Sequence, residues 1–297
     1  MSSDAPSTTP PTIDPVAAQR WARLRSDASP WLHEEVARRM AERLQWIRLQ
    51  PAAWLDWAPL RGGLLGHGLV TQKYPKSQCY VQEASVEWSS VAIKNIASPW
   101  WSAGRWMRSQ PRAGLPPDAS ADMVWANMAL HTADDPQGLM RQWHRALAPQ
   151  GFLMFSCLGP DTLRELHALY ARLDWPPPAH ACTDMHDWGD MLAGVGYAEP
   201  VMDMERISLS FETPERLLNE LRELGRNLHP ARFAALRGKA WRAQLCEALQ
   251  AELGQPLVLS FEVIYGHAIK PTPRAKVSEL SAVSLQDMRA MLHAGKP

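Results

Sequence analysis

The fold of this chain is decided by residues 54–63, which read Trp-Leu-Asp-Trp-Ala-Pro-Leu-Arg-Gly-Gly. A short apolar run ends at Asp56, a turn follows, and the apolar pattern resumes from Leu64 to Tyr74. This order predicts a strand, a tight turn and a helix. In α/β proteins a cofactor binds at the carboxyl end of the first strand and at the turn after it. The stretch therefore predicts an α/β fold with a cofactor site at this turn.

The turn departs from the glycine-rich pattern that such sites use. When D-x-G-x-G-x-G is laid on the chain from Asp56, only its last glycine is present, at Gly62. Ala58 and Leu60 stand at the two earlier glycine positions. Glycine permits positive φ and lets a ligand approach the backbone closely. The substitutions therefore predict weakened cofactor binding, unless a shifted turn uses Gly62 and Gly63 instead.

The composition excludes several classes of protein. The 297 residues, 46% of them hydrophobic, are enough for one large α/β domain with a packed core. Lys plus Arg equal Asp plus Glu at 31 each, which gives no argument for nucleic acid binding. No stretch approaches the roughly 20 apolar residues that span a bilayer, and no signal-peptide pattern is present. We expect a cytoplasmic protein without a membrane partner. The four cysteines are far apart, which argues against a disulfide framework or a zinc site.

Apolar periodicity predicts alternating strands and helices along the middle of the chain. A helical pattern over 15–49 comes first, and Pro51 ends it. The expected strands are 53–56, 78–83, 122–127, 151–157, 202–209 and 257–269, and the expected helices are 64–74, 85–96, 137–147, 159–170, 187–195 and 214–224. Asp161 or Thr162 is suited to capping the helix that ends at Tyr170. These elements predict a doubly wound, largely parallel sheet.

Polar residues follow the predicted strands. Glu83 closes the second strand, where an acidic group accepts both ribose hydroxyls of a nucleoside ligand; the alternative is a solvated carboxylate at a strand end. Asn127 closes the next strand and is expected to face the same crevice. His186 lies between Asp184 and Asp187, but a metal site needs more converging ligands than one helix start offers. We therefore expect a helix cap there and no metal site.

Four features follow one another along the chain: the turn from Asp56 to Gly62, Glu83, the strand that ends at Asn127, and a Leu-x-Pro-x-Gly turn at 147–151. Their order resembles that of a class I S-adenosylmethionine-dependent methyltransferase. Three later segments are more specific, namely 158–166 (Leu-Gly-Pro-Asp-Thr-Leu-Arg-Glu-Leu), 184–190 (Asp-Met-His-Asp-Trp-Gly-Asp) and 261–268 (Phe-Glu-Val-Ile-Tyr-Gly-His-Ala). These resemble the malonyl-acyl-carrier-protein O-methyltransferases of biotin synthesis. The resemblance runs from Trp21 to Lys270.

The resemblance implies an α/β fold with a Rossmann-like doubly wound, mostly parallel sheet. A helical lead-in precedes the sheet, and antiparallel edge strands from the C-terminal half complete it. The implied division is a disordered tail (1–14), a helical lead-in (15–50), a methyltransferase core (51–157), a substrate-side cap that completes the sheet (158–271) and a part-helical C-terminal tail (272–297).

The resemblance also implies the chemistry. S-adenosylmethionine would be the cofactor, and the acceptor would be the free carboxyl of a malonyl group on acyl carrier protein. The cofactor-binding residues would be Asp56, Ala58, Gly62, Glu83 and Asn127. A carboxylate is already ionised at neutral pH, so the reaction needs alignment rather than a general base. A cation is expected to hold the substrate carboxylate, and the sequence does not distinguish among Arg164, Arg222, Arg226 and Arg232.

The departures from the family pattern gather where the cofactor binds. Besides Ala58 and Leu60, Glu83 replaces an aspartate and Thr132 replaces an aromatic residue. Two hypotheses follow. The chain is an active carboxyl methyltransferase, as the intact later segments indicate, or it is a catalytically inactive methyltransferase-like partner or regulator, as the altered turn indicates.

Overall fold

A computed structural model describes residues 13–24, 28–96 and 109–273. Most of the expected N-terminal tail, residues 1–12, lies outside the described residues, as does most of the expected C-terminal tail, residues 274–297.

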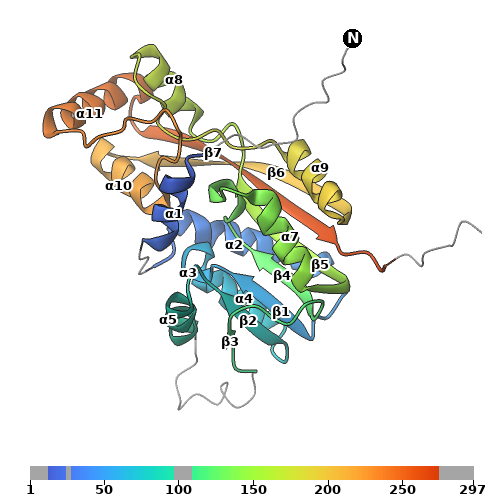
Figure 1. The fold of residues 1–297 in the computed structure, drawn as a ribbon. Coiled ribbons are helices and arrows are strands. Elements are labelled where there is room, and N and C mark those ends of the chain that lie inside the picture. Colours follow the sequence, from blue (N-terminus) through green and yellow to red (C-terminus); the bar gives the residue numbers. More distant parts are fainter. Residues whose placement is uncertain (1–12, 25–27, 97–108, 274–297) are drawn as a thin grey trace, which may run out of the picture.

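A seven-stranded sheet forms the centre of the described part (Figure 1), with the strand order β3-β2-β1-β4-β5-β7-β6. The strands are β1 (Ala53–Trp57), β2 (Gln78–Gln82), β3 (Arg112–Ala113), β4 (Ala121–Ala126), β5 (Leu147–Leu158), β6 (Ala198–Phe211) and β7 (Leu257–Ile269). The first five strands in this spatial order run parallel to one another. β7 lies antiparallel between β5 and β6. The predicted doubly wound sheet with antiparallel strands from the C-terminal half is confirmed.

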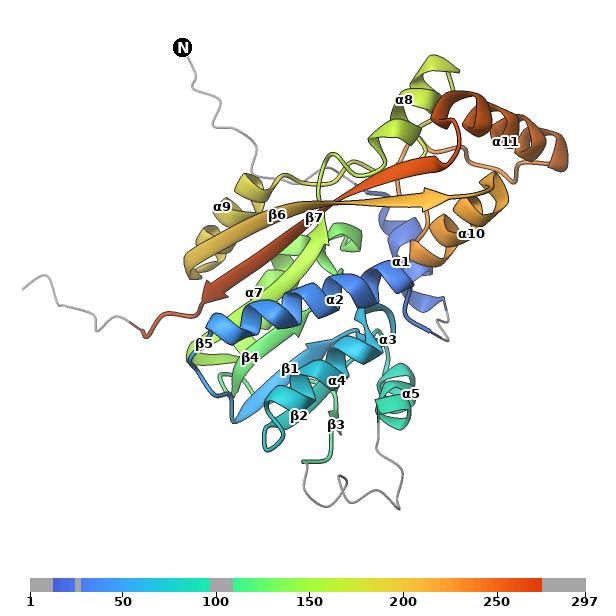
Figure 2. The ribbon, with the colours of Figure 1, turned by 180° about the vertical axis from the view of Figure 1, so that it is seen from behind.

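Helices cover both faces of this sheet. They are α1 (Pro15–Arg23), α2 (Trp31–Arg43), α3 (Pro59–Gly62), α4 (Leu64–Lys73), α5 (Val86–Ile96), α7 (Pro136–Ala146), α8 (Arg164–Arg172), α9 (Met185–Val195), α10 (Pro214–Leu224) and α11 (Lys239–Leu253). α2 and α4 pack on one face and α7 and α9 on the other, as the two opposite views show (Figures 1 and 2). Each face therefore has its own apolar core.

The region predicted to be helical over 15–49 is helical in the structure, but it is divided. Two helices occupy this region, and Pro30 is the N-cap residue of the second one. Proline lacks an N–H donor and disfavours helical backbone in the residue before it, so α2 starts anew at Trp31. A short 3-10 turn, Leu44–Trp46, ends the lead-in before Pro51.

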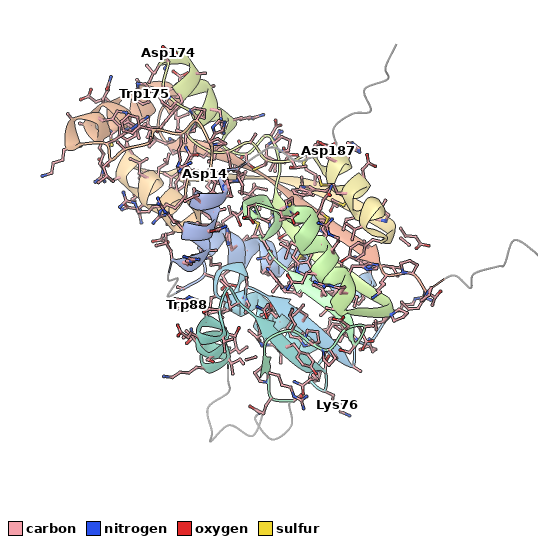
Figure 3. All side chains as sticks on the ribbon, in the orientation of Figure 1. Asp14, Lys76, Trp88, Asp174, Trp175 and Asp187 are labelled. Atoms are coloured by element: carbon pink, nitrogen blue, oxygen red, sulfur yellow. The ribbon has the colours of Figure 1, made fainter. Side chains whose placement is uncertain are left out.

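Two further differences lie in the C-terminal half. α8 begins at Arg164, five residues later than predicted, and its N-cap residue is Leu163 in the left-handed conformation. Thr162 does not cap it, because its hydroxyl donates to the backbone carbonyl of Glu262 (3.1 Å). The sequence patterns did not predict α11, which packs with α8 and α10 beyond the carboxyl end of β6. Trp175 lies at this end of the molecule (Figure 3), with its ring 5.6 Å from that of Trp241 on α11.

The start of α4 is fixed by α2. The Glu34 carboxylate accepts the backbone N–H groups of Leu64 (2.8 Å) and Leu65 (3.1 Å), which have no partner within their own helix. A Cβ on Gly66 would lie 2.5 Å from the Cβ of Ala37, so the two helices pack this closely only because of the glycine. Together these contacts set the position of the turn between β1 and α4. No helix in the described ranges has the length and apolar composition needed to cross a membrane.

Candidate active site

A cavity of about 270 Å³ opens at the carboxyl ends of β1, β2 and β4. The strand order reverses here, since β2 lies on one side of β1 and β4 on the other, and open α/β sheets bind ligands at such points. α1, the turn after β1, and the residues that follow β2 and β4 line the cavity. Ala58, Gly62, Glu83 and Asn127 are among the lining residues, and Asp56 is not. Four residues that the sequence predicts as cofactor-binding are thus brought together.

The turn after β1 accommodates both missing glycines. Ala58 adopts the left-handed conformation (φ 55°, ψ 49°) that glycine favours, at a cost of about 1–2 kcal/mol for a residue with a Cβ. Residues 59–62 then form one helical turn, α3, so Leu60 needs no positive φ. The Leu60 side chain is 3% exposed, belongs to the apolar core and is not part of the cavity wall. Neither substitution therefore closes the cavity.

Gly62 is the motif glycine that the packing requires. A Cβ at this position would lie 2.9 Å from the backbone oxygen of Asn127. The Asn127 side-chain amide donates to the carbonyl oxygens of His33 (2.8 Å) and Gly62, and its own oxygen accepts from the Ser156 hydroxyl (2.6 Å). Asn127 therefore joins the turn to α2 and β5 and shapes the cavity through these contacts.

Glu83 provides a buried carboxylate in the cavity wall. It is 8% exposed, and its Oε1 accepts the backbone N–H of Leu60 (2.8 Å). Burial raises the pKa of this carboxyl from 4.5 to about 7, although the Leu60 N–H acts in the opposite direction. No other donor among the described residues reaches the carboxylate. It is therefore free to accept hydrogen bonds from a ligand.

Asp56 lies behind the cavity and has a structural partner. Its carboxylate is 2% exposed and lies 2.7 Å from Nδ1 of His67 on α4. The His67 ring in turn packs against Trp54, with centroids 5.2 Å apart. Burial raises the pKa of Asp56, and the contact with His67 opposes this shift. The pair links the end of β1 to the helix that follows it.

Arg61 and Trp21 form a part of the cavity that sequence patterns did not identify. The Arg61 guanidinium donates to the carbonyl oxygens of Trp21 (2.7 Å) and Leu24 (2.5 Å) and lies 3.8 Å from the centroid of the Trp21 ring. Both residues line the cavity. Arg61 thus ties α1 to the turn after β1. Only the tertiary arrangement brings these residues together, because 40 positions separate them in the sequence.

A second cavity, of about 410 Å³, adjoins the first. α8, residues 178–182 and residues 224–227 line it, and most of its wall is apolar. His131, Thr132 and Leu224 border both cavities. The two cavities are therefore adjacent at these three residues, which we call the junction.

Buried His131 lies at the junction, and partly buried His180 lies beside it in the wall of the second cavity. The rings of His131 and His180 are nearly parallel, with centroids 6.5 Å apart. Nε2 of His180 donates to the backbone oxygen of His131 (2.8 Å). Within the described part of the chain, Nδ1 of each ring is buried without a hydrogen-bond partner. Burial lowers the pKa of both imidazoles, so both are neutral near pH 7.

The structure separates the four candidate arginines, of which Arg222 is exposed on α10 and lines neither cavity. Arg164 and Arg226 line the second cavity, whereas Arg232 is paired with Asp14 (2.7 Å) at the start of α1. Arg164 contacts Glu165 (3.2 Å). Arg226 donates to the backbone carbonyl of Gly225 (2.8 Å) and has no carboxylate partner among the described residues. Arg226 is therefore the arginine best placed to bind an anion in the cavity.

The segment around His186 forms a helix cap, as predicted. The Asp184 carboxylate accepts the backbone N–H of His186 (2.8 Å) at the start of α9. Over the ranges that the structure describes, no group of three or more His, Cys, Asp or Glu side chains is arranged to hold a metal ion. The four cysteines are free.

This strand order, with a cavity at the strand ends, agrees with the fold that the resemblance to class I S-adenosylmethionine-dependent methyltransferases implies. A family model described as a methyltransferase domain matches residues 65–155. A solved structure of a candidate methyltransferase from Bacillus halodurans C-125 has a TM-score of 0.52 and 17% identity, and the match covers 78% of this chain and 99% of that one. This similarity supports the fold.

Curated relatives identify the family more closely. The malonyl-acyl-carrier-protein O-methyltransferase of Gallionella capsiferriformans (strain ES-2) is 39% identical over 84% of this chain and 87% of the relative. The protein of the same name from Laribacter hongkongensis (strain HLHK9) is 35% identical over 85% of this chain and 88% of the relative. The chain belongs to the malonyl-acyl-carrier-protein O-methyltransferase family.

Proposed function

We propose that this chain transfers the methyl group of S-adenosylmethionine to the free carboxyl of a malonyl thioester on acyl carrier protein, in biotin precursor synthesis. The observation that carries the proposal is the junction at His131, Thr132 and Leu224, where a cavity at the strand ends meets a larger, mostly apolar cavity. The names of the relatives describe this activity for those proteins.

The first cavity suits the cofactor. The Glu83 carboxylate is placed to accept the ribose hydroxyls, and the backbone from Ala58 to Gly62 forms the adjoining wall. Asn127 holds this wall in place, and Asp56 anchors β1 behind it through His67. S-adenosylmethionine supplies an electrophilic methyl group on a positively charged sulfur.

The second cavity suits the acyl substrate. Its malonyl carboxylate is ionised at neutral pH, so no residue needs to remove a proton. Arg226 is placed to bind this carboxylate and direct it toward the junction. Apolar wall residues such as Leu158 and Phe261 exclude water from the path of transfer. The contribution of the chain is alignment of the two reactants.

In this proposal the lead-in, the core and the cap each form a different part of the two binding sites. The core (51–157) holds the cofactor, the lead-in (15–50) covers it through α1, and the cap (158–271) forms most of the acyl cavity. The carrier protein would present its thioester at the mouth of that cavity, and the reaction would take place in the cytoplasm.

Methyl transfer to defined substrates tests the proposal. The full chain is incubated with methyl-labelled S-adenosylmethionine and malonyl-acyl carrier protein, and we expect a base-labile methyl ester on the carrier. Acetyl-acyl carrier protein, which lacks the free carboxyl, should receive no label. Arg226→Met should reduce the transfer at least tenfold, whereas Arg216→Met, which removes an exposed arginine paired with Glu212 (3.0 Å), should not. The absence of label on the malonyl carrier would contradict the proposal.

A further inference from the structure

Arg61 brings a positive charge into the wall of the cofactor cavity. It occupies the position before Gly62, within the turn after β1, and lines the cavity together with Trp21 and Glu83. S-adenosylmethionine carries a positive charge on its sulfur, whereas the product S-adenosylhomocysteine has a neutral sulfur. A fixed cation in the wall therefore acts differently on the two ligands.

The guanidinium is held in place. It donates to the carbonyl oxygens of Trp21 (2.7 Å) and Leu24 (2.5 Å), and the Trp21 ring lies 3.8 Å from it. Two hydrogen bonds and a ring contact leave the side chain few alternative positions. The charge of Arg61 therefore remains in the wall when a ligand enters.

The surroundings of Arg61 do not cancel this charge. Glu83 is the acidic group that acts most strongly on it, and burial raises the pKa of Glu83 to about 7, so this carboxyl is partly protonated at neutral pH. Arg226 adds a second positive charge nearby. Burial lowers the pKa of Arg61, but a guanidinium stays protonated at neutral pH.

We propose that Arg61 makes the cavity discriminate by ligand charge, disfavouring cationic S-adenosylmethionine relative to S-adenosylhomocysteine. The inference rests on the proposed function, since it takes these two molecules as the ligands. A cavity of about 270 Å³ keeps any bound atom close to its wall. At an effective dielectric constant of about 20, two unit charges within about 10 Å of each other repel strongly enough to change a binding constant about tenfold or more. Arg61 is thus a specificity residue that increases inhibition by the product.

Calorimetric titration of the full chain with both ligands tests this inference. The wild-type chain should bind S-adenosylhomocysteine at least about tenfold more tightly than S-adenosylmethionine. Arg61→Gln keeps an N–H donor for the carbonyl oxygens but removes the charge, and it should reduce this ratio about tenfold. Arg61→Lys retains the charge and should retain the ratio. Arg20→Gln removes an exposed charge of α1 outside the cavity wall and serves as the matched control.

Thermal melting of each variant establishes that it is folded. Hydrogen exchange in α1 should increase in both Arg61 variants, because neither side chain reproduces the full set of guanidinium contacts with Trp21 and Leu24. An unchanged ratio in Arg61→Gln, or an equal gain in affinity for both ligands, would overturn the role of the charge and leave the proposed function standing. If no variant and no wild-type chain binds either ligand, the proposed function fails and this inference fails with it.

Discussion

Glu83→Gln should make the protein more stable and the cofactor site weaker, and both effects should depend on pH. The substitution preserves the shape of the side chain and an oxygen that can accept the Leu60 N–H. It removes a carboxyl whose pKa burial raises from 4.5 to about 7. The folded state holds this proton more tightly than the unfolded chain does.

The sign and size of the stability effect follow from this pKa. The stabilisation from protonated Glu83 is fully present below about pH 4.5 and is lost as the pH rises through about 7. A pKa raised from 4.5 to about 7 corresponds to roughly 3 kcal/mol against the ionised form. Glutamine carries no such cost. The variant should therefore match the wild type near pH 4.5 and exceed its stability by up to about 3 kcal/mol above pH 8.

Unlike stability, the affinity for the ligand should rise as Glu83 becomes ionised. The ionised carboxylate accepts stronger hydrogen bonds from both ribose hydroxyls than the protonated carboxyl, which has lost acceptor capacity to its own O–H. With a pKa of about 7, its ionised fraction rises from about one tenth at pH 6 to about nine tenths at pH 8. Wild-type affinity for S-adenosylhomocysteine should therefore rise about tenfold over this range, whereas the affinity of Glu83→Gln should be lower and flat.

Urea unfolding and calorimetric titration at pH 6, 7 and 8 measure both effects. The reasoning requires that stability and affinity move in opposite directions in the variant. If wild-type affinity did not change with pH, or if the variant lost stability at pH 8, the carboxyl would not have the raised pKa and the free oxygen that the structure gives it.

Three other substitutions probe the same region. Ala58→Gly should stabilise the fold by about 1 kcal/mol, measured by chemical unfolding, because it relieves the left-handed alanine. Gly62→Ala should destabilise it by about 1–3 kcal/mol in the same assay, since the new Cβ would lie 2.9 Å from the backbone oxygen of Asn127. His180→Phe, at a residue that lines the acyl cavity but not the cofactor cavity, should lower kcat/KM for the malonyl carrier about tenfold while leaving S-adenosylhomocysteine affinity unchanged, and an equal loss of both would indicate a general packing defect.

Local patterns predicted the elements that carry complete start and stop signals. The bounds of β7 (Leu257–Ile269) and α10 (Pro214–Leu224) agree with the prediction, because Pro214 starts that helix and Gly225 follows it. α11 was missed because apolar residues do not mark one clear face along Lys239–Leu253. The helical lead-in was predicted but its division before Trp31 was not, because the apolar spacing that indicated a helix, from Val36 to Ile47, lies entirely after Pro30.

The candidate site was predictable where it depends on strand ends. Glu83 and Asn127 follow β2 and β4, the two parallel strands on either side of β1, so their convergence on one cavity follows from the topology. The contact of Arg61 with α1 and the pairing of His131 with His180 join segments 40 and 49 positions apart. Such contacts depend on how helices pack on the finished sheet, and single-sequence periodicity holds no information on them.

The altered glycine motif shows why a motif must be examined position by position. A glycine pattern stands for two separate physical needs, a positive φ and the absence of a Cβ. At Ala58 the need is for φ, and alanine meets it at a modest cost. At Leu60 the helical turn of α3 removes the need, and the side chain joins the core instead. At Gly62 the need is for space next to Asn127, and this glycine is retained. The substitutions that suggested an inactive protein therefore fall where the backbone tolerates them, and the cavity beside Ala58 remains open to a ligand.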